Sequence, residues 1–302
     1  ISQEIYRRPE SNESYLSGSI LVLAFVFFVK VFYLAFFVTP LWDIPDETGH
    51  LAYVIHLADG GGLPVLGQAK IPTEIMSHVF QEKNASAVNN WIAQHPPLFY
   101  YVAAGPYWLA KNFTSDVDIL FRIPRLVAVI SGSILLLVLY RFARLLGLNN
   151  HSSVCIAGCV GWIPMVSNLS SGTNHDIPLF LVCALSAYYL TKFVIRRSIA
   201  HALFAAFWLA VACGIKMTAW VILPPFFLVL LLEVRDDWRS RVFHLAGIMA
   251  VAVCVPVLWM LRNLFEYGNP TYTASTDGVW SREVPLEHSF LEYFGSQPVV
   301  DQ

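Results

Sequence analysis

Long runs of apolar residues, separated by short polar stretches, dominate the chain. A helix that crosses a bilayer needs about 20 mostly apolar residues, because its backbone polar groups must be hydrogen-bonded within the segment. Five runs fit this requirement. They are Ser17–Val38, Ile119–Tyr140, Ser152–Leu169, Ile177–Ile195 and Val242–Leu261. The pattern predicts an all-α fold, a polytopic bundle of membrane helices.

A sixth apolar stretch, Ala200–Leu232, is too long for one crossing. The sequence Cys213-Gly214-Ile215-Lys216 interrupts it, so we expect a tight hairpin of two helices, the first one short, with Lys216 near the turn. This hairpin raises the expected number of crossings to about seven. Lys30 lies deep in the first run, and we expect it to point into the bundle.

The segment Pro97–Phe113 is also apolar, but it is rich in Tyr and Trp and contains Gly105-Pro106. Cytoplasmic loops are enriched in Lys and Arg. Arg7 and Arg8 place the N-terminus inside, and three later clusters fall inside only if this segment does not cross. These clusters are Arg141/Arg144, Arg196/Arg197 and Arg235/Arg239/Arg241. We therefore expect the segment to lie along the outer interface, with the C-terminus outside.

Composition agrees with a membrane protein. The chain has 302 residues, of which 56% are hydrophobic and 13% charged, whereas soluble domains carry about 25% charged residues. The net charge is −2 and no Lys/Arg run is present, which excludes nucleic acid as a partner and leaves membrane lipids. We expect one membrane domain, residues 1–302, with a long outer loop at about 39–118 and an outer tail at about 262–302.

A cluster of acidic residues and one histidine follows the first apolar run. It reads Trp42-Asp43-Ile44-Pro45-Asp46-Glu47-Thr48-Gly49-His50. Pro45 suits the first turn of a helix, and acidic residues suit its positive N-terminal end. Helical spacing places Asp46 and Glu47 on one face with His50, so with Asp43 they form a candidate general base or cation site. The alternative is a plain acidic helix start beside an interfacial histidine.

Other candidate site residues lie in further segments expected on the outer side. They are His95 in Gln94-His95-Pro96-Pro97, Arg122 and Arg125 around Pro124, Asn174 and Asp176 in a short polar turn, Lys216 in the hairpin, and Arg262 where the last run ends. A charge in a membrane segment is costly and usually functional, so Lys216 is a candidate phosphate ligand. The ordinary alternatives are an exposed histidine, a helix cap, or cations at the membrane boundary.

Together these residues resemble the GT-C class of membrane glycosyltransferases. The similarity is greatest to a bacterial group of multi-pass proteins with P-D-E-x-x-H-like and H-P-P-L-x-Y-Y-like motifs, related to protein mannosyltransferases and aminoarabinose transferases. The matching segments are Pro45–His50, His95–Tyr101, Arg122–Leu126, Asn174–Asp176, Gly214–Thr218 and Arg262–Pro270. Each motif is weak alone, but their order and spacing make the set fairly specific.

The resemblance implies a reaction at the outer face of a bacterial inner membrane. A polyprenyl-phosphate sugar is the donor, a glycan, lipid or protein is the acceptor, and an acidic residue of the first loop deprotonates the acceptor. Asp46 matches this general base, Glu47 is its assistant or rival, and His50 is a candidate to orient the carboxylate. The candidates for holding the lipid phosphate are Lys216, Arg125 and Arg262. We expect no cofactor and no metal.

Most members of this group carry further C-terminal spans, so we expect the chain to be a fragment or to work with a partner subunit. Two other functions stay open on the sequence. A transporter or flippase of lipid-linked sugars would also use buried charges and broken helices, although its charges would lie near the midplane. A non-catalytic assembly subunit would explain a short chain, but not the acidic cluster or Lys216.

Overall fold

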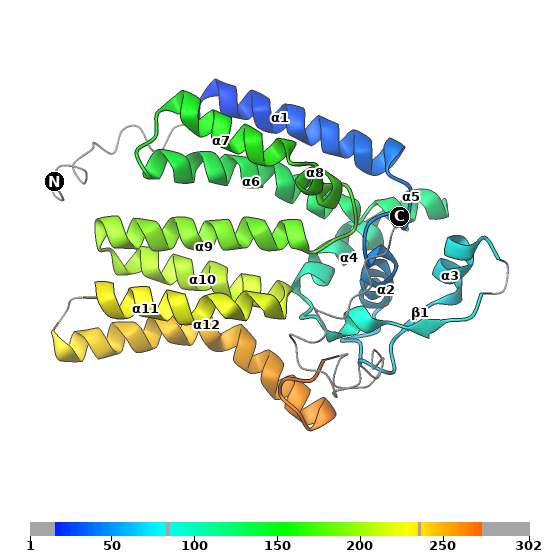
Figure 1. Ribbon diagram of the computed structural model, residues 1–302. Helices are drawn as coiled ribbons and strands as arrows, with labels where there is room; N and C mark the ends of the chain where they lie inside the picture. The colour runs from blue at the N-terminus through cyan, green and yellow to red at the C-terminus, as the bar shows by residue number, and fades with distance from the viewer. Residues whose placement is uncertain (1–15, 83–84, 235–236, 274–302) are drawn as a thin grey trace, which may run out of the picture.

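The computed structural model describes residues 16–82, 85–234 and 237–273. Within these residues the long apolar runs are helical, and the long helices lie side by side in one bundle (Figure 1). The bundle contains α1 (Gly18–Tyr33), extended by the π-helical η2 (Leu34–Val38), α6 (Arg125–Leu145), α7 (Asn150–Trp162), α9 (Asp176–Arg196), α10 (Ile199–Ile215), α11 (Leu223–Glu233) and α12 (Trp238–Tyr267). The predicted all-α membrane bundle is confirmed.

Four helical segments in the described part are long and apolar enough to cross a membrane. A fifth is obtained if α7 and α8 (Pro164–Ser170), which are bent by 68° at their junction, count as one span. The remaining two apolar segments are shorter: they are α10, and η4 (Met217–Ile222) continued by α11. All seven predicted segments are therefore helical, but two are shorter than a full crossing usually requires.

The predicted outer loop folds into short elements gathered at one end of the bundle (Figure 1). They are α2 (Glu47–Ala58), β1 (Lys70–Ile71), α3 (Thr73–Phe80), β2 (Val88–Asn89), η3 (Trp91–Gln94), α4 (Leu98–Ala110) and α5 (Val117–Arg122). β1 and β2 pair antiparallel, with Lys70 opposite Asn89. Leu51, Ile75 and Phe121 pack together in a small apolar cluster of this loop. The loop is thus a folded unit that can position side chains.

α4 corresponds to the segment expected at the interface. It has 13 residues, and at 1.5 Å per residue it is about 20 Å long, shorter than a hydrocarbon layer of about 30 Å. Its buried face, including Tyr100 and Ala103, belongs to the main apolar core. These features agree with a helix that does not cross. The orientation of the chain remains a prediction, and Arg7, Arg8 and Arg235 lie outside the described residues.

Two apolar clusters hold the bundle together. One joins α1, α6, α7 and α8 and includes the fully buried Phe27. The other joins α2 and α4 to α9, α10, α11 and α12 and includes Leu209. Lys30 points inward, where its Nζ donates a hydrogen bond to Ser167 Oγ at 2.7 Å, as predicted. The second cluster fixes the loop helices α2 and α4 against the bundle.

The interrupted stretch forms two helices with a break at Lys216, as predicted, but the first is not the short one: α10 has 17 residues and α11 has 11. α10 ends at Ile215, and Lys216 is extended (φ −151°, ψ 134°) before η4 begins. The end of α10, the start of α9 and the end of α12 lie at the end of the bundle where the loop elements gather (Figure 1). A Cβ added to Gly172 would lie 2.8 Å from Ile44 Cβ, so the turn before α9 contacts the segment before α2 directly.

Candidate functional site

Asp46 lies immediately before α2, with its side chain exposed. Its backbone is left-handed (φ 61°, ψ 10°), and so is that of Trp42 (φ 74°). Such conformations are uncommon for residues other than glycine and cluster at functional sites. Trp91 Nε1 donates a hydrogen bond to Asp46 Oδ1 at 3.0 Å. The loop therefore presents this carboxylate outward in one defined position.

Glu47, the next residue, is buried and fully engaged. Arg125 donates to both of its oxygens, from Nε to Oε1 and from Nη2 to Oε2, each at 2.8 Å. The backbone N–H of Thr173 donates to Oε1 and that of Trp42 to Oε2, each at 2.9 Å. One carboxylate thus joins the loop, α6 and the turn before α9. This arrangement argues against Glu47 as a general base and makes it an anchor for Asp46.

The guanidinium of Arg125 is fully buried, and all five of its N–H bonds are used. Besides Glu47 it donates to the carbonyl oxygens of Ala35 (2.7 Å), Thr39 (3.0 Å) and Pro40 (2.8 Å). No N–H is left for a lipid phosphate, so the sequence-based role of Arg125 as a phosphate ligand does not fit the structure. Arg125 instead ties the end of η2 to α6.

Two other charged candidates of this region, Arg122 and Asp43, are not part of the Glu47–Arg125 ion pair. Arg122 Nη1 donates to the carbonyl oxygens of Ala35 (3.1 Å) and Thr39 (2.9 Å), which gives Arg122 a bracing role beside Arg125. Asp43 is exposed. The expected shared site of three carboxylates and His50 is therefore not formed: each of these side chains has different surroundings.

His50 lies one turn after Asp46 and is buried. Its Nδ1 is 2.9 Å from Tyr100 Oη on α4, and the two rings are stacked. Tyr100 stacks in turn on Tyr53, with ring centroids 3.9 Å apart. Burial, followed by nearby histidines, holds the pKa of His50 well below its usual range. His50 therefore contacts an aromatic layer between α2 and α4 and does not contact the Asp46 carboxylate.

Two more histidines lie beside His50. The ring centroid of His175 is 4.6 Å from that of His50 and 4.9 Å from that of His95. Burial, with Lys216 as a second cause, lowers the pKa of His95 to about 4. Burial, then His95 and Lys216, lowers that of His175 to about 2. All three imidazoles are therefore neutral at pH 7.

Lys216 is paired with Asp176, the first residue of α9. Its Nζ donates to Asp176 Oδ1 at 2.7 Å, and the two side chains are 23% and 27% exposed. Asn174 Oδ1 accepts the backbone N–H of Asp176 at 2.6 Å, which fixes the start of α9. Lys216 is thus a partly exposed cation at the outer-loop end of the bundle, and Asn174 supports its partner.

Arg262 joins α12 to the first loop. It donates to the carbonyl oxygen of Pro64 and to Tyr267 Oη, both at 2.9 Å. Its guanidinium also lies 5.0 Å from the ring centroids of Trp259 and Tyr267. Tyr267 Oη in turn accepts the backbone N–H of Leu66 at 2.8 Å. Arg262 therefore holds the end of α12 against the loop, and it is partly buried there.

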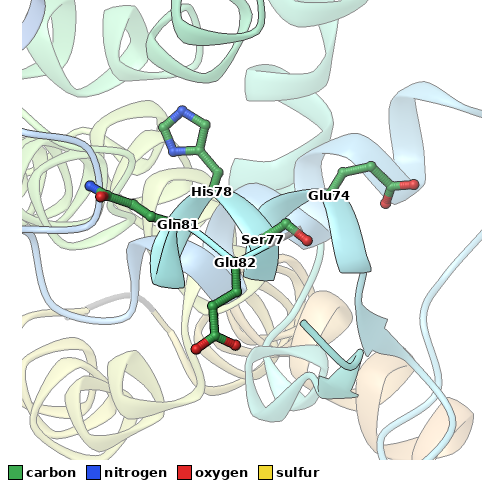
Figure 2. A pocket seen from close by; sticks show the side chains of 5 residues that line it. All are labelled: Glu74, Ser77, His78, Gln81 and Glu82. Carbon is green, nitrogen blue, oxygen red and sulfur yellow. The ribbon is translucent and has the colours of Figure 1, made fainter. Parts of the chain in front are cut away.

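An open depression lies on the outer surface of α3 (Figure 2). It is lined by Glu74, Ser77, His78, Gln81 and Glu82. None of the predicted site residues lines it. On its other side His78 accepts a hydrogen bond from Trp42 Nε1 at 3.1 Å and contacts Asp118 Oδ1 at 2.8 Å. His78 thus connects this depression to Trp42 in the segment before α2.

Sequence reasoning missed four residues of this region as site residues. They are Trp91, Tyr100, Thr173 and His175. Tyr100 and His175 belong to the motifs His95–Tyr101 and Asn174–Asp176, but nothing in a single sequence pairs position 50 with positions 100 and 175. Among the predicted residues, the structure gathers His50, His95, Asp176 and Lys216 around His175.

A family model described as dolichyl-phosphate-mannose-protein mannosyltransferase matches residues 94–260, more than half of the chain. This range includes His95, Asp176 and Lys216 and begins after Asp46. No curated protein sequence matches the chain.

Among solved structures, the chain is similar to the S. cerevisiae protein O-mannosyltransferase Pmt1-Pmt2 complex bound to the sugar donor, with a TM-score of 0.55 and 15% sequence identity. The match covers 86% of this chain and 35% of that chain, so the present chain spans about a third of its length. At this identity the likeness concerns the fold, and it confirms the predicted GT-C-like membrane bundle.

Proposed function

The chain belongs to the dolichyl-phosphate-mannose-protein mannosyltransferase family, and on this basis we propose that it transfers a sugar from a polyprenyl-phosphate donor to a cell-envelope acceptor. The acceptor is a glycan, lipid or protein, and the reaction takes place at the outer face of the membrane. The observation that carries this proposal is the contrast between Asp46 and Glu47: one carboxylate is rigidly anchored, while its neighbour is exposed on a left-handed backbone.

Asp46 is the proposed general base. It takes the proton of an acceptor hydroxyl while that oxygen attacks the anomeric carbon of the donor sugar. The bond between this carbon and the phosphate oxygen breaks, and the phosphate leaves with the electron pair on its lipid. Trp91 donates to one carboxylate oxygen of Asp46 at 3.0 Å, which leaves the other oxygen for the acceptor. Exposure of Asp46 supports this role, because the acceptor arrives from outside the bundle.

Lys216 is the proposed ligand of the departing phosphate. It is a partly exposed cation beside the start of α9, and positive charge there would stabilise the negative charge that develops on the phosphate. In the structure Lys216 is ion-paired with Asp176. A bound phosphate would therefore either share the ammonium group with Asp176 or displace Asp176 from it. Arg262 is a second candidate, although three hydrogen bonds already hold its guanidinium.

The test is binding and transfer with the purified chain in lipid nanodiscs and a radiolabelled polyprenyl-phosphate hexose. Transfer of label to an envelope extract is expected. Lys216→Ala should weaken binding of this lipid by about 10- to 100-fold, the range of a lost hydrogen bond to a charged group. Lys192→Ala is the control, because Lys192 lies on α9 against Tyr188, away from the proposed site. Unchanged affinity in both Lys216→Ala and Arg262→Ala would refute the phosphate site.

A further inference from the structure

Three histidines from three separate segments meet between the loop and the start of α9. His50 comes from α2, His95 precedes α4, and His175 lies just before α9. The ring centroid of His175 lies 4.6 Å from that of His50 and 4.9 Å from that of His95. The mechanism proposed above uses none of these rings. His175 is only 3% exposed, so its ring lies inside the protein.

The cluster contains buried polar atoms without a hydrogen-bond partner. They are Nδ1 and Nε2 of His175, Nδ1 of His95, and Oγ1 of Thr173. Buried polar groups in native proteins are almost always paired, so several orphans on one short turn and its neighbour indicate a polar group that binds there. His50 differs, since its Nδ1 is bonded to Tyr100.

The cluster borders the surface on one side. His95 is half-buried, and the side chains of Asp176 and Lys216 are 27% and 23% exposed. His175 Nε2 lies 3.9 Å from Asp176 Oδ1, the atom that Lys216 holds. A molecule whose charged end lies at Lys216 would therefore bring its next group against the orphan atoms of His175 and His95.

The chemistry of the cluster selects the kind of group. The pKa values of His95 and His175 are lowered to about 4 and about 2, chiefly by burial, so each ring offers one N–H and one acceptor nitrogen at pH 7. A hydroxyl group both donates and accepts a hydrogen bond, so it suits both kinds of imidazole nitrogen. Thr173 Oγ1 can likewise donate to or accept from a hydroxyl group. The oxygens of an ionised phosphate only accept hydrogen bonds, so they could not bond to the unprotonated imidazole nitrogens. In the described part of the chain, no His, Cys, Asp and Glu set has a metal-binding arrangement.

We propose that His95, His175 and Thr173 form a hydroxyl-binding subsite that holds the sugar ring of the lipid donor. This inference rests on the proposed function, because it takes the donor to be a sugar joined to a lipid phosphate. The phosphate then lies at Lys216, the sugar hydroxyls face the imidazoles, and the anomeric carbon is directed toward the loop that carries Asp46. His50 lies one helical turn after Asp46, and its backbone N–H donates to Asp46 O at 3.0 Å in the first turn of α2.

The test compares two probes on the purified full chain: a polyprenyl phosphate that carries one hexose, and the same polyprenyl phosphate without the sugar. The ratio of their dissociation constants isolates the contribution of the sugar. In His175→Phe, which keeps a ring of similar size, this preference for the hexose probe should fall about tenfold, while affinity for the bare phosphate stays within about twofold. Thr173→Val should lower the preference for the hexose probe by a smaller factor. His151→Phe, at an exposed position of α7, should leave both affinities unchanged.

The outcomes separate this inference from the proposed function. If the wild type prefers the hexose probe and folded His175→Phe and Thr173→Val keep that preference, bound water satisfies the cluster and the subsite is refuted. Equal weakening of both probes in these variants also refutes it. If the wild type binds neither probe, the proposed lipid donor fails as well. A melting temperature within a few degrees of wild type establishes that each variant is folded.

Discussion

The side chains of Asp46 and Glu47 have opposite surroundings, although they are neighbours. Asp46 is exposed and Glu47 is 1% exposed. Glu47 accepts four hydrogen bonds from Arg125, Thr173 and Trp42. Glu47 begins α2, whereas Asp46 precedes it in a left-handed conformation (φ 61°, ψ 10°), so the two consecutive side chains point in different directions. The anchor explains why a strained backbone at Asp46 can persist.

Removing the charge of Glu47 should destabilise the fold. In Glu47→Gln the buried guanidinium of Arg125 loses its counter-charge, and breaking a buried ion pair costs about 3–5 kcal/mol. We expect a clear drop in melting temperature in detergent, measured by intrinsic fluorescence. Glu74→Gln, at an exposed position on α3, should change it by less than about 0.5 kcal/mol. A Glu47→Gln variant with unchanged stability and no transfer would instead identify Glu47 as the base.

Residue types and spacing predicted part of this site. Pro45, Asp46 and Glu47 correctly predicted a helix start, and Lys216 correctly marked a break between helices. The partner of Glu47 could not be predicted, because Arg125 lies 78 positions away and reaches it only through the packing of α6. For the same reason the chemistry of Arg125 suggested a phosphate ligand, whereas its five N–H bonds are used within the protein.

At the scale of elements, apolar length predicted the helices well but carried no information about local bends, although Pro164 stands where α8 begins. The kink of 68° between α7 and α8 and the π-helical turn η2 have no signal in hydropathy. The short strands β1 and β2 were also missed, since two residues each are too few for a visible alternation. These details matter because α8 leads into the turn that contacts the loop.

The close approach of this turn to the loop should be sensitive to one methyl group. In Gly172→Ala the added Cβ would lie 2.8 Å from Ile44 Cβ, so the segment before Asp46 must shift. Overpacking of this kind costs about 1–3 kcal/mol, and we expect a lower melting temperature together with reduced transfer. Gly247→Ala on α12 is the control, because a Cβ there meets nothing within 4 Å. Equal behaviour of the two variants would mean that this contact does not position the loop.

For the whole molecule, the helices place the loop elements, the start of α9 and the ends of α10 and α12 at one end of the bundle (Figure 1). The sequence predicted this clustering from its arginine-rich loops, which lie between the other helix ends. Which end faces outward follows from the positive-inside rule and not from the fold.

Cysteine labelling would test that orientation. In a variant whose five native cysteines are replaced by alanine, a cysteine at Asn89 should react with an impermeant reagent in intact cells. A cysteine at Asn149, at the opposite side of α6, should react only after the membrane is opened. Both positions are exposed in the structure. Labelling of both in intact cells would mean that α4 crosses the membrane.

Asp46 is the proposed base of the sugar transfer, and the transfer rate of Asp46→Asn tests this role most directly. Asparagine keeps the size of the side chain and an oxygen for Trp91 but removes the basicity. General-base loss lowers rates by about 10²–10⁴-fold, so transfer from the polyprenyl-phosphate hexose should nearly vanish while donor binding and melting temperature are retained. Asp59→Asn, at the exposed end of α2, should transfer normally. A folded Asp46→Asn variant with near wild-type transfer would show that Asp46 is not the base.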